Sequence, residues 1–385
     1  MLEPHAGFHL SPAAFPLQHV QSVPPDPQDL ATRTGSWLQG NGPEADVVIS
    51  SRVRLARNLS GLPFRSTLSS ERATEVPNRL KGELLDLALE GETTWVSLAD
   101  TDETLRRVLF ERSLATRELV SGDETGELAG RAVAFGGDEG LAALIGEEDH
   151  IRLQSLTSGL DLEVALDRVV QLDRQLEARV TYATHHDLGY LTACPSNVGT
   201  GMRASVMLHL PALGAVRSEL QKVFQAAQHT GLAVRGLHGE GSKASGDLYQ
   251  ISNQVTLGSS ESELVARLLV LVRGVVRTER GMRQALLAAR ASALKDRVAR
   301  GMVVLRSARA LSTDEALRHL SVIRFGHHVG LVQGLSTCLL NRLALQIQQG
   351  HLYALHRSGQ DGPVDHSERR RLRAALLRSE FAGRG

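Results

Sequence analysis

A pair of arginines separated by one residue stands in the segment Ser51-Arg52-Val53-Arg54-Leu55. The segment belongs to a β-branched run that starts at residue 46 and predicts a strand, on which alternate residues point to the same face. Two guanidinium groups side by side repel each other unless an anion lies between them, and each can hold two phosphate oxygens. The pattern therefore favours phosphate binding; a solvated strand face is the alternative.

Three consecutive carboxylates, Glu147, Glu148 and Asp149, follow a short apolar run and precede Arg152. Such a cluster can position a cation, or raise the pKa of one carboxyl group until it becomes a useful base. An acidic surface loop is the alternative, because such loops are common.

A lone cysteine, Cys194, closes the run from Gly189, which predicts a short strand, and opens a loop of small residues that ends at Arg203. This arrangement suits a thiolate held near a cationic substrate, with loop amides available to phosphate oxygens. A buried structural cysteine before a turn is the alternative.

A fourth segment is glycine-rich and carries one charge of each sign, at Arg235 and Glu240. Its glycines allow close approach of the backbone to a ligand, although an ordinary turn has the same composition. The sequence contains no Walker loop, dinucleotide fingerprint, Cys-x-x-Cys or His-Glu-x-x-His pattern. The adjacent histidine pairs at 185–186 and 327–328 do not share a helix face, so we predict no protein metal site.

The elements that position these segments mix strands and helices. Strands are predicted at 131–135, 141–145, 189–194, 204–210, 232–237 and 248–255, with a helix over the apolar repeat from Leu162 to Leu176. Capping boxes at Ser260/Glu263 and Ser312/Glu315 open a helical region. We therefore predict an α+β fold: an antiparallel sheet flanked by helices over residues 46–280, then an all-helical domain over residues 281–385. Residues 1–45 are Pro-rich and are predicted to be a poorly ordered extension.

Composition narrows the classes of function. The 385 residues carry 43 Lys and Arg against 43 Asp and Glu, which argues against a nucleic-acid footprint or a polybasic membrane patch. No apolar run approaches the roughly 18 residues of a membrane helix, and the N-terminus does not resemble a secretory signal. The two cysteines, Cys194 and Cys338, fit a reducing cytoplasm.

Taken together, the four segments resemble the phosphagen (guanidino) kinase family, in the same order and at similar spacing. The run Gly189-Tyr190-Leu191-Thr192-Ala193-Cys194-Pro195-Ser196-Asn197 is similar to the signature around that family's active-site cysteine. The run from Glu147 to Arg152 is similar to its acidic catalytic segment, with Gly146 where Asn is usual. The resemblance covers residues 46–280.

The resemblance implies a role for each segment. ATP with Mg²⁺ on its phosphates would be the cofactor, Glu148 would accept the proton of the substrate guanidinium, Glu240 would fix its other side, and Cys194 would lie against it. The arginines would stabilise the transferring phosphoryl group. The implied nucleotide-binding residues are Ser51, Arg52, Val53, Arg54, Leu55, Arg152, Arg203, Ala204, Ser205, Val206, Met207, Arg235, Gly236, Leu237, His238, Gly239 and Glu240.

Two features are similar to the bacterial branch that phosphorylates protein arginines. Only about 45 residues precede the first arginine motif, too few for the helical lid domain of small-molecule kinases, and residues 281–385 resemble that branch's helical domain. The resemblance implies protein substrates marked for an ATP-dependent protease, a stress response, an activator protein and a homodimer. Two alternatives stay open: a small-molecule arginine kinase, and a non-catalytic phosphoarginine-binding adaptor.

Two positions depart from that branch. Ser113 stands where the branch has a His near the nucleotide base. The branch's Arg-Asp-x-x-Arg-Ala phosphoarginine pocket corresponds to the run that starts at Arg369 and includes Arg373, with Arg370 in place of Asp. Since Arg370 cannot accept a hydrogen bond, we expect weak or no allosteric sensing of phosphoarginine.

Overall fold

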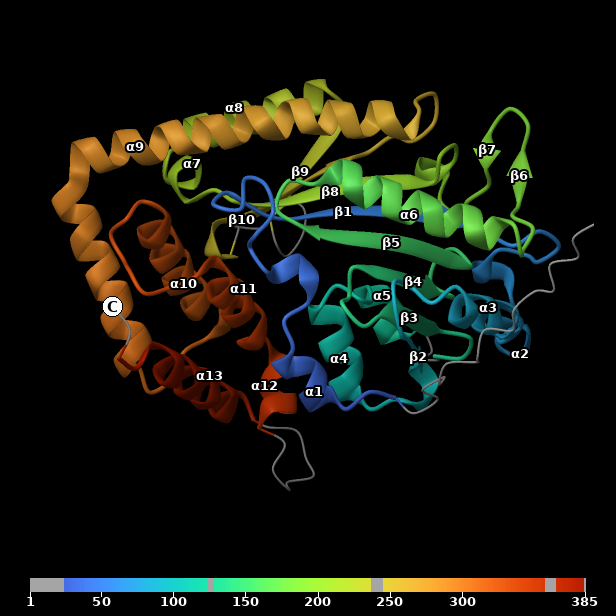
Figure 1. The fold of residues 1–385 in the computed structure, drawn as a ribbon, viewed down its shortest axis with the longest axis horizontal. Helices are drawn as coiled ribbons and strands as arrows, with labels where there is room; N and C mark the ends of the chain where they lie inside the picture. Colours follow the sequence, from blue (N-terminus) through green and yellow to red (C-terminus); the bar gives the residue numbers. More distant parts are fainter. Residues whose placement is uncertain (1–23, 123–127, 237–244, 357–364, 384–385) are drawn as a thin grey trace, which may run out of the picture.

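The computed structural model describes residues 24–122, 128–236, 245–356 and 365–383. Its centre is an eight-stranded sheet in the order β2-β3-β4-β5-β1-β8-β10-β9, in which every neighbouring pair is antiparallel (Figure 1). A hairpin of two further strands stands apart. The antiparallel sheet is thereby confirmed. The strands are β1 (Val48–Arg57), β2 (Thr93–Ser97), β3 (Ala132–Gly136), β4 (Leu141–Ile145), β5 (Ile151–Ser158), β6 (Thr184–His185), β7 (Gly189–Tyr190), β8 (Met202–His209), β9 (Leu232–Gly236) and β10 (Leu248–Asn253).

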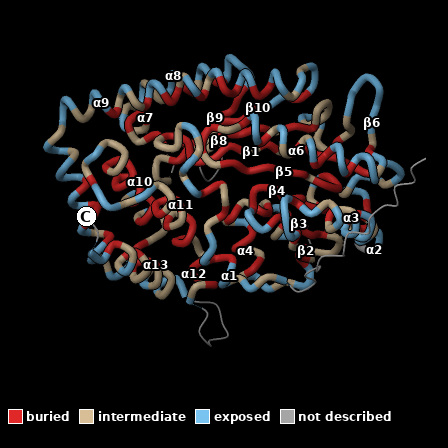
Figure 2. Tube along the Cα trace, in the orientation of Figure 1, coloured by how far each residue is buried: buried red, intermediate tan, exposed pale blue. Residues whose placement is uncertain are grey.

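Helices cover one face of the central strands. Helix α6 (Leu162–Glu177) packs on β1 and β5, and α9 (Glu261–Ser307) packs on β8 and β10 (Figure 1). The buried side chains between them, among them Val53, Leu55 and Val206, belong to the largest apolar core among the described residues. The central strands are accordingly mostly coloured as buried in Figure 2. This burial holds the central strands rigidly in register, as a site spread over several strands requires.

The remaining helices form two further groups. Over the β2–β4 side lie α1 (Pro27–Thr32), α4 (Glu103–Glu111), α5 (Arg117–Ser121) and α12 (Gln349–Leu355). The end of α9 packs with α10 (Thr313–His328), α11 (Thr337–Gln346) and α13 (His366–Phe381) around a separate apolar core. The helical C-terminal region is thus confirmed. The other α-helices are α2 (Ser70–Ala73), α3 (Glu75–Asp86), α7 (Pro211–Ala215) and α8 (Arg217–His229).

Both predicted capping boxes are present. Ser260 and Glu263 open α9, and Ser312 and Glu315 open α10, each by reciprocal side chain–backbone hydrogen bonds. Helix α9 continues past the expected domain boundary at residue 280 and bends where Arg290 leaves helical geometry, with φ −139° and ψ 36° (Figure 1). Across the described ranges, we find no helix that combines the length and the apolar character needed to cross a membrane.

The predicted disorder of the N-terminal extension is wrong for residues 24–45. Helix α1 begins there, with Pro27 at its first position and Asp26 accepting a hydrogen bond from the Gln28 amide at 2.8 Å. Proline is favoured at that position because it has no amide hydrogen to lose, so Pro27 marks a helix start. Leu30 and Leu38 are buried, which fixes the segment to the fold. Residues 1–23 lie outside the described ranges.

The strand predicted at 189–194 is largely wrong. Only Gly189 and Tyr190 pair, in β7, and the chain then leaves the sheet. Cys194 immediately precedes a short 3₁₀ turn. The run from Gly189 to Cys194 predicts a strand, but hydrogen bonds from other segments determine the path of this loop.

Candidate active site

The strand register brings the predicted arginines to one face of the sheet, opposite α6 and α9. Arg54 pairs with Arg203 of β8, and Arg52 pairs with Ser205. Directly paired residues share a face, and alternate residues return to it, so the register extends this face across β5, β8, β10 and β9. The arginines gathered there are Arg52, Arg54, Arg152, Arg203 and Arg235.

Burial and the neighbouring arginines lower the pKa of two members of this cluster, Arg52 and Arg54. Burial and the charges of Arg203 and Arg152 lower the pKa of Arg52 to about 10. Burial, Arg52, Arg152 and Arg203 lower the pKa of Arg54 well below its ordinary value, against a smaller opposing effect of Glu147. A bound polyphosphate would offset this repulsion, so the cluster has the charge of an anion-binding site.

A carboxylate and a thiol meet beside this cluster. Burial raises the pKa of Glu148, and the charge of Asp149 raises it further, against the lowering effects of Arg152 and of a hydrogen bond with Cys194. The Glu148 side chain remains 43 % exposed, and Arg152 Nη2 lies 3.5 Å from its Oε2. A carboxylate with a raised pKa, open to solvent and next to an anion site, is suited to act as a general base.

The turn between β4 and β5 holds Glu148 in place. Arg152 binds Glu147 at 2.7 Å, and Thr116 donates to Glu147 Oε2 at 2.7 Å. Gly146 begins the turn with φ +74°, and a Cβ there would lie 2.2 Å from the Gly130 carbonyl oxygen. The positive φ suits Gly, and Asn tolerates it better than most residues.

A buried asparagine, Asn58, which belongs to none of the sequence motifs above, joins this turn to the cysteine loop. Asn58 Nδ2 donates to Asp149 Oδ1 at 2.7 Å and to the Leu191 carbonyl at 3.0 Å. The same Asp149 oxygen accepts the Ala193 amide at 2.8 Å. These bonds place Cys194 next to Glu148, so Asn58 and Asp149 are positioning residues.

A buried ion pair supports the far end of the same loop. Arg57 binds Asp173 of α6 through hydrogen bonds of 3.1 and 2.7 Å, and its Nη1 donates to the Thr200 carbonyl at 2.9 Å. Its guanidinium carbon lies 3.4 Å from the centre of the Tyr190 ring. The sequence carried one signal for this pair: Asp173 falls on the otherwise apolar face of α6.

A cavity of about 390 Å³ adjoins the arginine cluster. Arg52, Ser205 and Met207 line it from the sheet, and Ser113 lines it from the end of α4. Its volume falls within the roughly 300–1,000 Å³ typical of small-molecule sites. The structure therefore places an anion-binding cluster of arginines next to a cavity large enough for a nucleoside.

Other predicted nucleotide contacts lie elsewhere. The buried side chains of alternate residues face the helix-covered side of the sheet, where they cannot line this cavity: Ser51, Val53, Leu55, Ala204 and Val206. Gly236 ends β9. Residues 237–244 lie outside the described ranges, so the roles predicted for Leu237, His238, Gly239 and Glu240 stay predictions.

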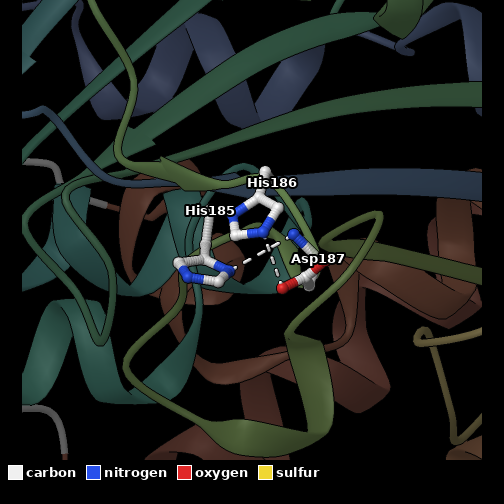
Figure 3. Close-up of side chains that lie close together, drawn as sticks. All are labelled: His185, His186 and Asp187. Atoms are coloured by element: carbon white, nitrogen blue, oxygen red, sulfur yellow. Dashed lines mark hydrogen bonds and ion pairs between the residues drawn. The ribbon is translucent and has the colours of Figure 1, made fainter.

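One group of possible metal ligands comes together among the described residues, at the hairpin of β6 and β7 (Figure 3). The ligand atoms of His185, His186 and Asp187 lie within 4.8 Å of one another. His186 already forms an ion pair with Asp187 at 2.8 Å, and the Asp187 amide donates to His185 at 3.3 Å. All three side chains are exposed, without the buried supporting partners typical of protein metal sites. We assign no metal to them.

The arginines of the expected phosphoarginine pocket hold the C-terminal helices together. Arg373 is buried and donates to the carbonyls of Ile347 at 2.8 Å and Leu311 at 2.9 Å. Arg369 donates to the Tyr353 hydroxyl at 2.8 Å, and Arg370 lies 3.5 Å from Glu315. Each of these side chains is thus already engaged within the helical region.

Replacing Cys194 by serine is expected to reduce catalytic activity sharply, because a serine hydroxyl stays neutral where a thiol can ionise. The Cys338→Ser variant provides the matched control, since Cys338 lies in α11 and is the other free cysteine. Alkylation of that variant should inactivate it unless nucleotide and substrate are present, as followed by mass spectrometry of the modified peptide. Full activity of Cys194→Ser would leave this cysteine with a packing role only.

Known proteins share both parts of this architecture. The family model for the ATP:guanido phosphotransferase C-terminal catalytic domain matches residues 75–282. The model for the protein-arginine kinase McsB C-terminal domain matches residues 291–384, so the bend at Arg290 lies between the two matches. Among solved structures, a lombricine kinase has a TM-score of 0.56 at 25% identity, covering 70% of this chain and 74% of that one. A taurocyamine kinase from Schistosoma mansoni has a TM-score of 0.56 at 27% identity, covering 67% and 36%.

The curated relatives match nearly end to end. A protein-arginine kinase from Symbiobacterium thermophilum is 39% identical over 359 residues, which covers 92% of this chain and 99% of the relative. One from Shouchella clausii is 40% identical over 354 residues, covering 91% and 96%. The arginine cluster and the carboxylate–thiol pair fit these matches, and the chain belongs to the ATP:guanido phosphotransferase family, and within it to the protein-arginine kinases.

Proposed function

We propose that this enzyme transfers the γ-phosphoryl group of ATP to the guanidinium of arginine side chains in proteins. The observation that carries the proposal is the convergence of five arginines from four strands on one sheet face, beside the paired Glu148 and Cys194. When bound, ATP supplies the phosphoryl group and the leaving ADP, with Mg²⁺ carried on its phosphates.

In this mechanism Glu148 accepts the proton that the substrate guanidinium loses as its nitrogen attacks. A base is needed because a guanidinium, with a pKa above about 12, is not a nucleophile while protonated. The N–P bond forms as the bond from the γ-phosphorus to the bridging oxygen breaks, and the electron pair leaves on ADP. Arg54 and Arg203 face the charge that develops on the phosphoryl oxygens.

Cys194 and Glu148 together form a site for a cation. The thiol lies against the position that the substrate guanidinium would take, and Asp149 holds its loop there. Glu148 is 43 % exposed, which supports a substrate whose main chain stays outside while one side chain enters. We therefore favour protein arginine over free arginine, the alternative substrate.

We further propose that residues 46–280 form the catalytic domain and residues 281–385 a dimerising, regulatory helical domain. The proposal also includes an activator protein and an ATP-dependent protease that receives the phosphorylated proteins. It places the enzyme in the cytoplasm, where it acts during stress. The sequence identity of 39% and 40% to two protein-arginine kinases, over 92% and 91% of the chain, supports it.

One experiment separates the candidate functions. The protein is incubated with ATP and either an arginine-containing protein or free arginine, and acid-labile phosphate is located by mass spectrometry. Phosphoarginine within the protein supports the proposal, and phosphorylation of free arginine alone supports a small-molecule kinase. Phosphoarginine binding without any transfer would instead indicate an adaptor.

We predict that free phosphoarginine binds the C-terminal region weakly or not at all. Such a pocket needs cationic groups at one end and a hydrogen-bond acceptor at the other. Arg373 already donates hydrogen bonds to two carbonyls. Arg370 can only donate a hydrogen bond at the position where the family motif has an acceptor. Calorimetric titration of the Glu148→Gln variant, which avoids turnover, measures the binding. Stoichiometric binding that Arg369→Ala abolishes would contradict this prediction.

A further inference from the structure

The cysteine loop, residues 190–199, is closed at its base and supported on the side that leads to Cys194. Its ends meet in an isolated β-bridge, where the Tyr190 amide donates to the Gly199 carbonyl at 2.9 Å. The bonds from Asn58 and Asp149 described above hold the part of the loop that precedes the cysteine. The part that follows the cysteine therefore needs a support of its own if the thiol is to keep one position.

A buried threonine from another part of the sheet supplies this second support. Thr256 follows β10 and is 3 % exposed. Its Oγ1 lies 2.6 Å from the Val198 carbonyl oxygen and 3.0 Å from that of Ser196, and it shares its single hydroxyl hydrogen between them. The packing is close, because a Cβ on Gly199 would lie 2.9 Å from both the Leu257 Cα and the Thr256 carbonyl oxygen. The second half of the cysteine loop is thus bound to the chain that leaves β10.

The same chain is fixed to the strand that carries Arg203. Asn253, the last residue of β10, is buried, and its Oδ1 accepts the Ala204 amide at 2.7 Å. Its Nδ2 donates to the Met202 carbonyl at 3.0 Å and to the Val255 carbonyl at 3.4 Å. One side chain thus binds the main chain on both sides of Arg203 and the chain that continues to the supporting threonine.

We propose that Thr256 is a positioning residue for phosphoryl transfer, which sets the place of the cysteine loop relative to β8. The inference rests on the proposed function, in which the substrate guanidinium lies against Cys194 and the phosphoryl group faces Arg203. In-line attack requires these two groups to be held at a fixed separation, and a misplacement of about 1 Å can cost roughly a hundredfold in rate. Thr256 acts through the loop, because its hydroxyl is bonded to the two loop carbonyls.

Replacing Thr256 by valine keeps the shape of the side chain and removes the hydroxyl. Turnover with an arginine-containing protein, measured by rapid quench, should fall roughly 10- to 100-fold, while the ADP affinity measured by calorimetry stays within about twofold, because the arginines are intact. Thr256→Ser keeps the hydroxyl and should restore turnover to within about threefold of wild type. Thr157→Val is the matched control, since Thr157 of β5 is also buried and donates to a carbonyl, that of Asp161, at 3.0 Å.

A double variant shows whether Thr256 acts through the thiol. Thr256→Val combined with Cys194→Ser should be no slower than Cys194→Ser alone, since residues that act as a unit give non-additive losses. Thr256→Ala removes the same hydroxyl by truncation, so the test does not depend on one variant folding, and melting temperatures identify the folded variants. Losses that multiply, unchanged turnover in the folded variants, or a loss that serine does not restore would each overturn the inference. Absence of phosphoarginine in the wild-type reaction would instead refute the proposed function.

Discussion

Replacing Glu148 by glutamine is expected to slow phosphoryl transfer by roughly 10²–10⁴-fold, the usual contribution of a positioned general base. Affinity for ADP should change little, because the cavity and the arginines are left intact. Rapid-quench measurement of phosphoarginine formation gives the rate, and calorimetry gives the affinity. Turnover within threefold of wild type would remove Glu148 from this role; Glu163→Gln, an exposed glutamate of α6, is the control.

The raised pKa of Glu148 adds two consequences. Glu148 must be ionised to accept a proton, so activity should fall on acidification at a higher pH than an ordinary glutamate would give. For stability, a carboxyl group with a raised pKa stabilises the fold below its unfolded-state pKa, and this contribution is lost as pH rises through the folded pKa. Glutamine cannot ionise, so the melting temperature of Glu148→Gln at neutral pH should not be lower than that of wild type.

Replacing Arg203 by alanine is expected to reduce turnover by roughly 10²–10³-fold, the loss typical of one donor to a charge that develops in the transition state. ADP affinity should fall much less, because the γ-phosphoryl group that Arg203 is proposed to face is missing from ADP. Arg203 stands directly opposite Arg54 in the β1–β8 register. Steady-state kinetics and ADP calorimetry on the same variant provide the comparison.

The melting temperature of Arg203→Ala distinguishes an electrostatic role of Arg203 from a structural one. The charge of Arg203 contributes to the lowered pKa of Arg54, so removing it relieves repulsion among the arginines. The melting temperature of Arg203→Ala should therefore equal or exceed that of wild type, whereas loss of a structural residue would lower it. Arg217→Ala, on the exposed start of α8, is the control. Equal losses of ADP affinity and turnover would assign Arg203 to ground-state nucleotide binding instead.

Much of the site follows from local sequence rules. The two-residue repeat is enough to place Arg52 and Arg54 on one face, and two capping boxes are enough to locate the starts of α9 and α10. The antiparallel class follows from short strands with hairpin spacing. These features are predictable because each depends on residues a few positions apart.

Other parts depend on contacts that no local pattern records. Asn58 has no motif of its own; its importance comes from Asp149 and Leu191, which reach it only in the folded chain. The order of α1 depends on burial of Leu30 against α12 and α4. Likewise, the part of the cavity wall that Arg324 of α10 contributes could not be anticipated, because packing between distant helices decides it.

The position of β1 in the sheet also bears on how the protein is made. It is the first strand of the described chain, yet it lies in the middle of the sheet, where Arg52 pairs with Leu156 on one side and Ser205 on the other. During synthesis this strand leaves the ribosome long before either neighbour exists. Contacts between residues so far apart in sequence slow folding and leave strand edges unpaired meanwhile. The arginine cluster therefore cannot be complete in a growing chain until β9, which carries Arg235, has been synthesised, and nascent fragments shorter than this should have no kinase activity.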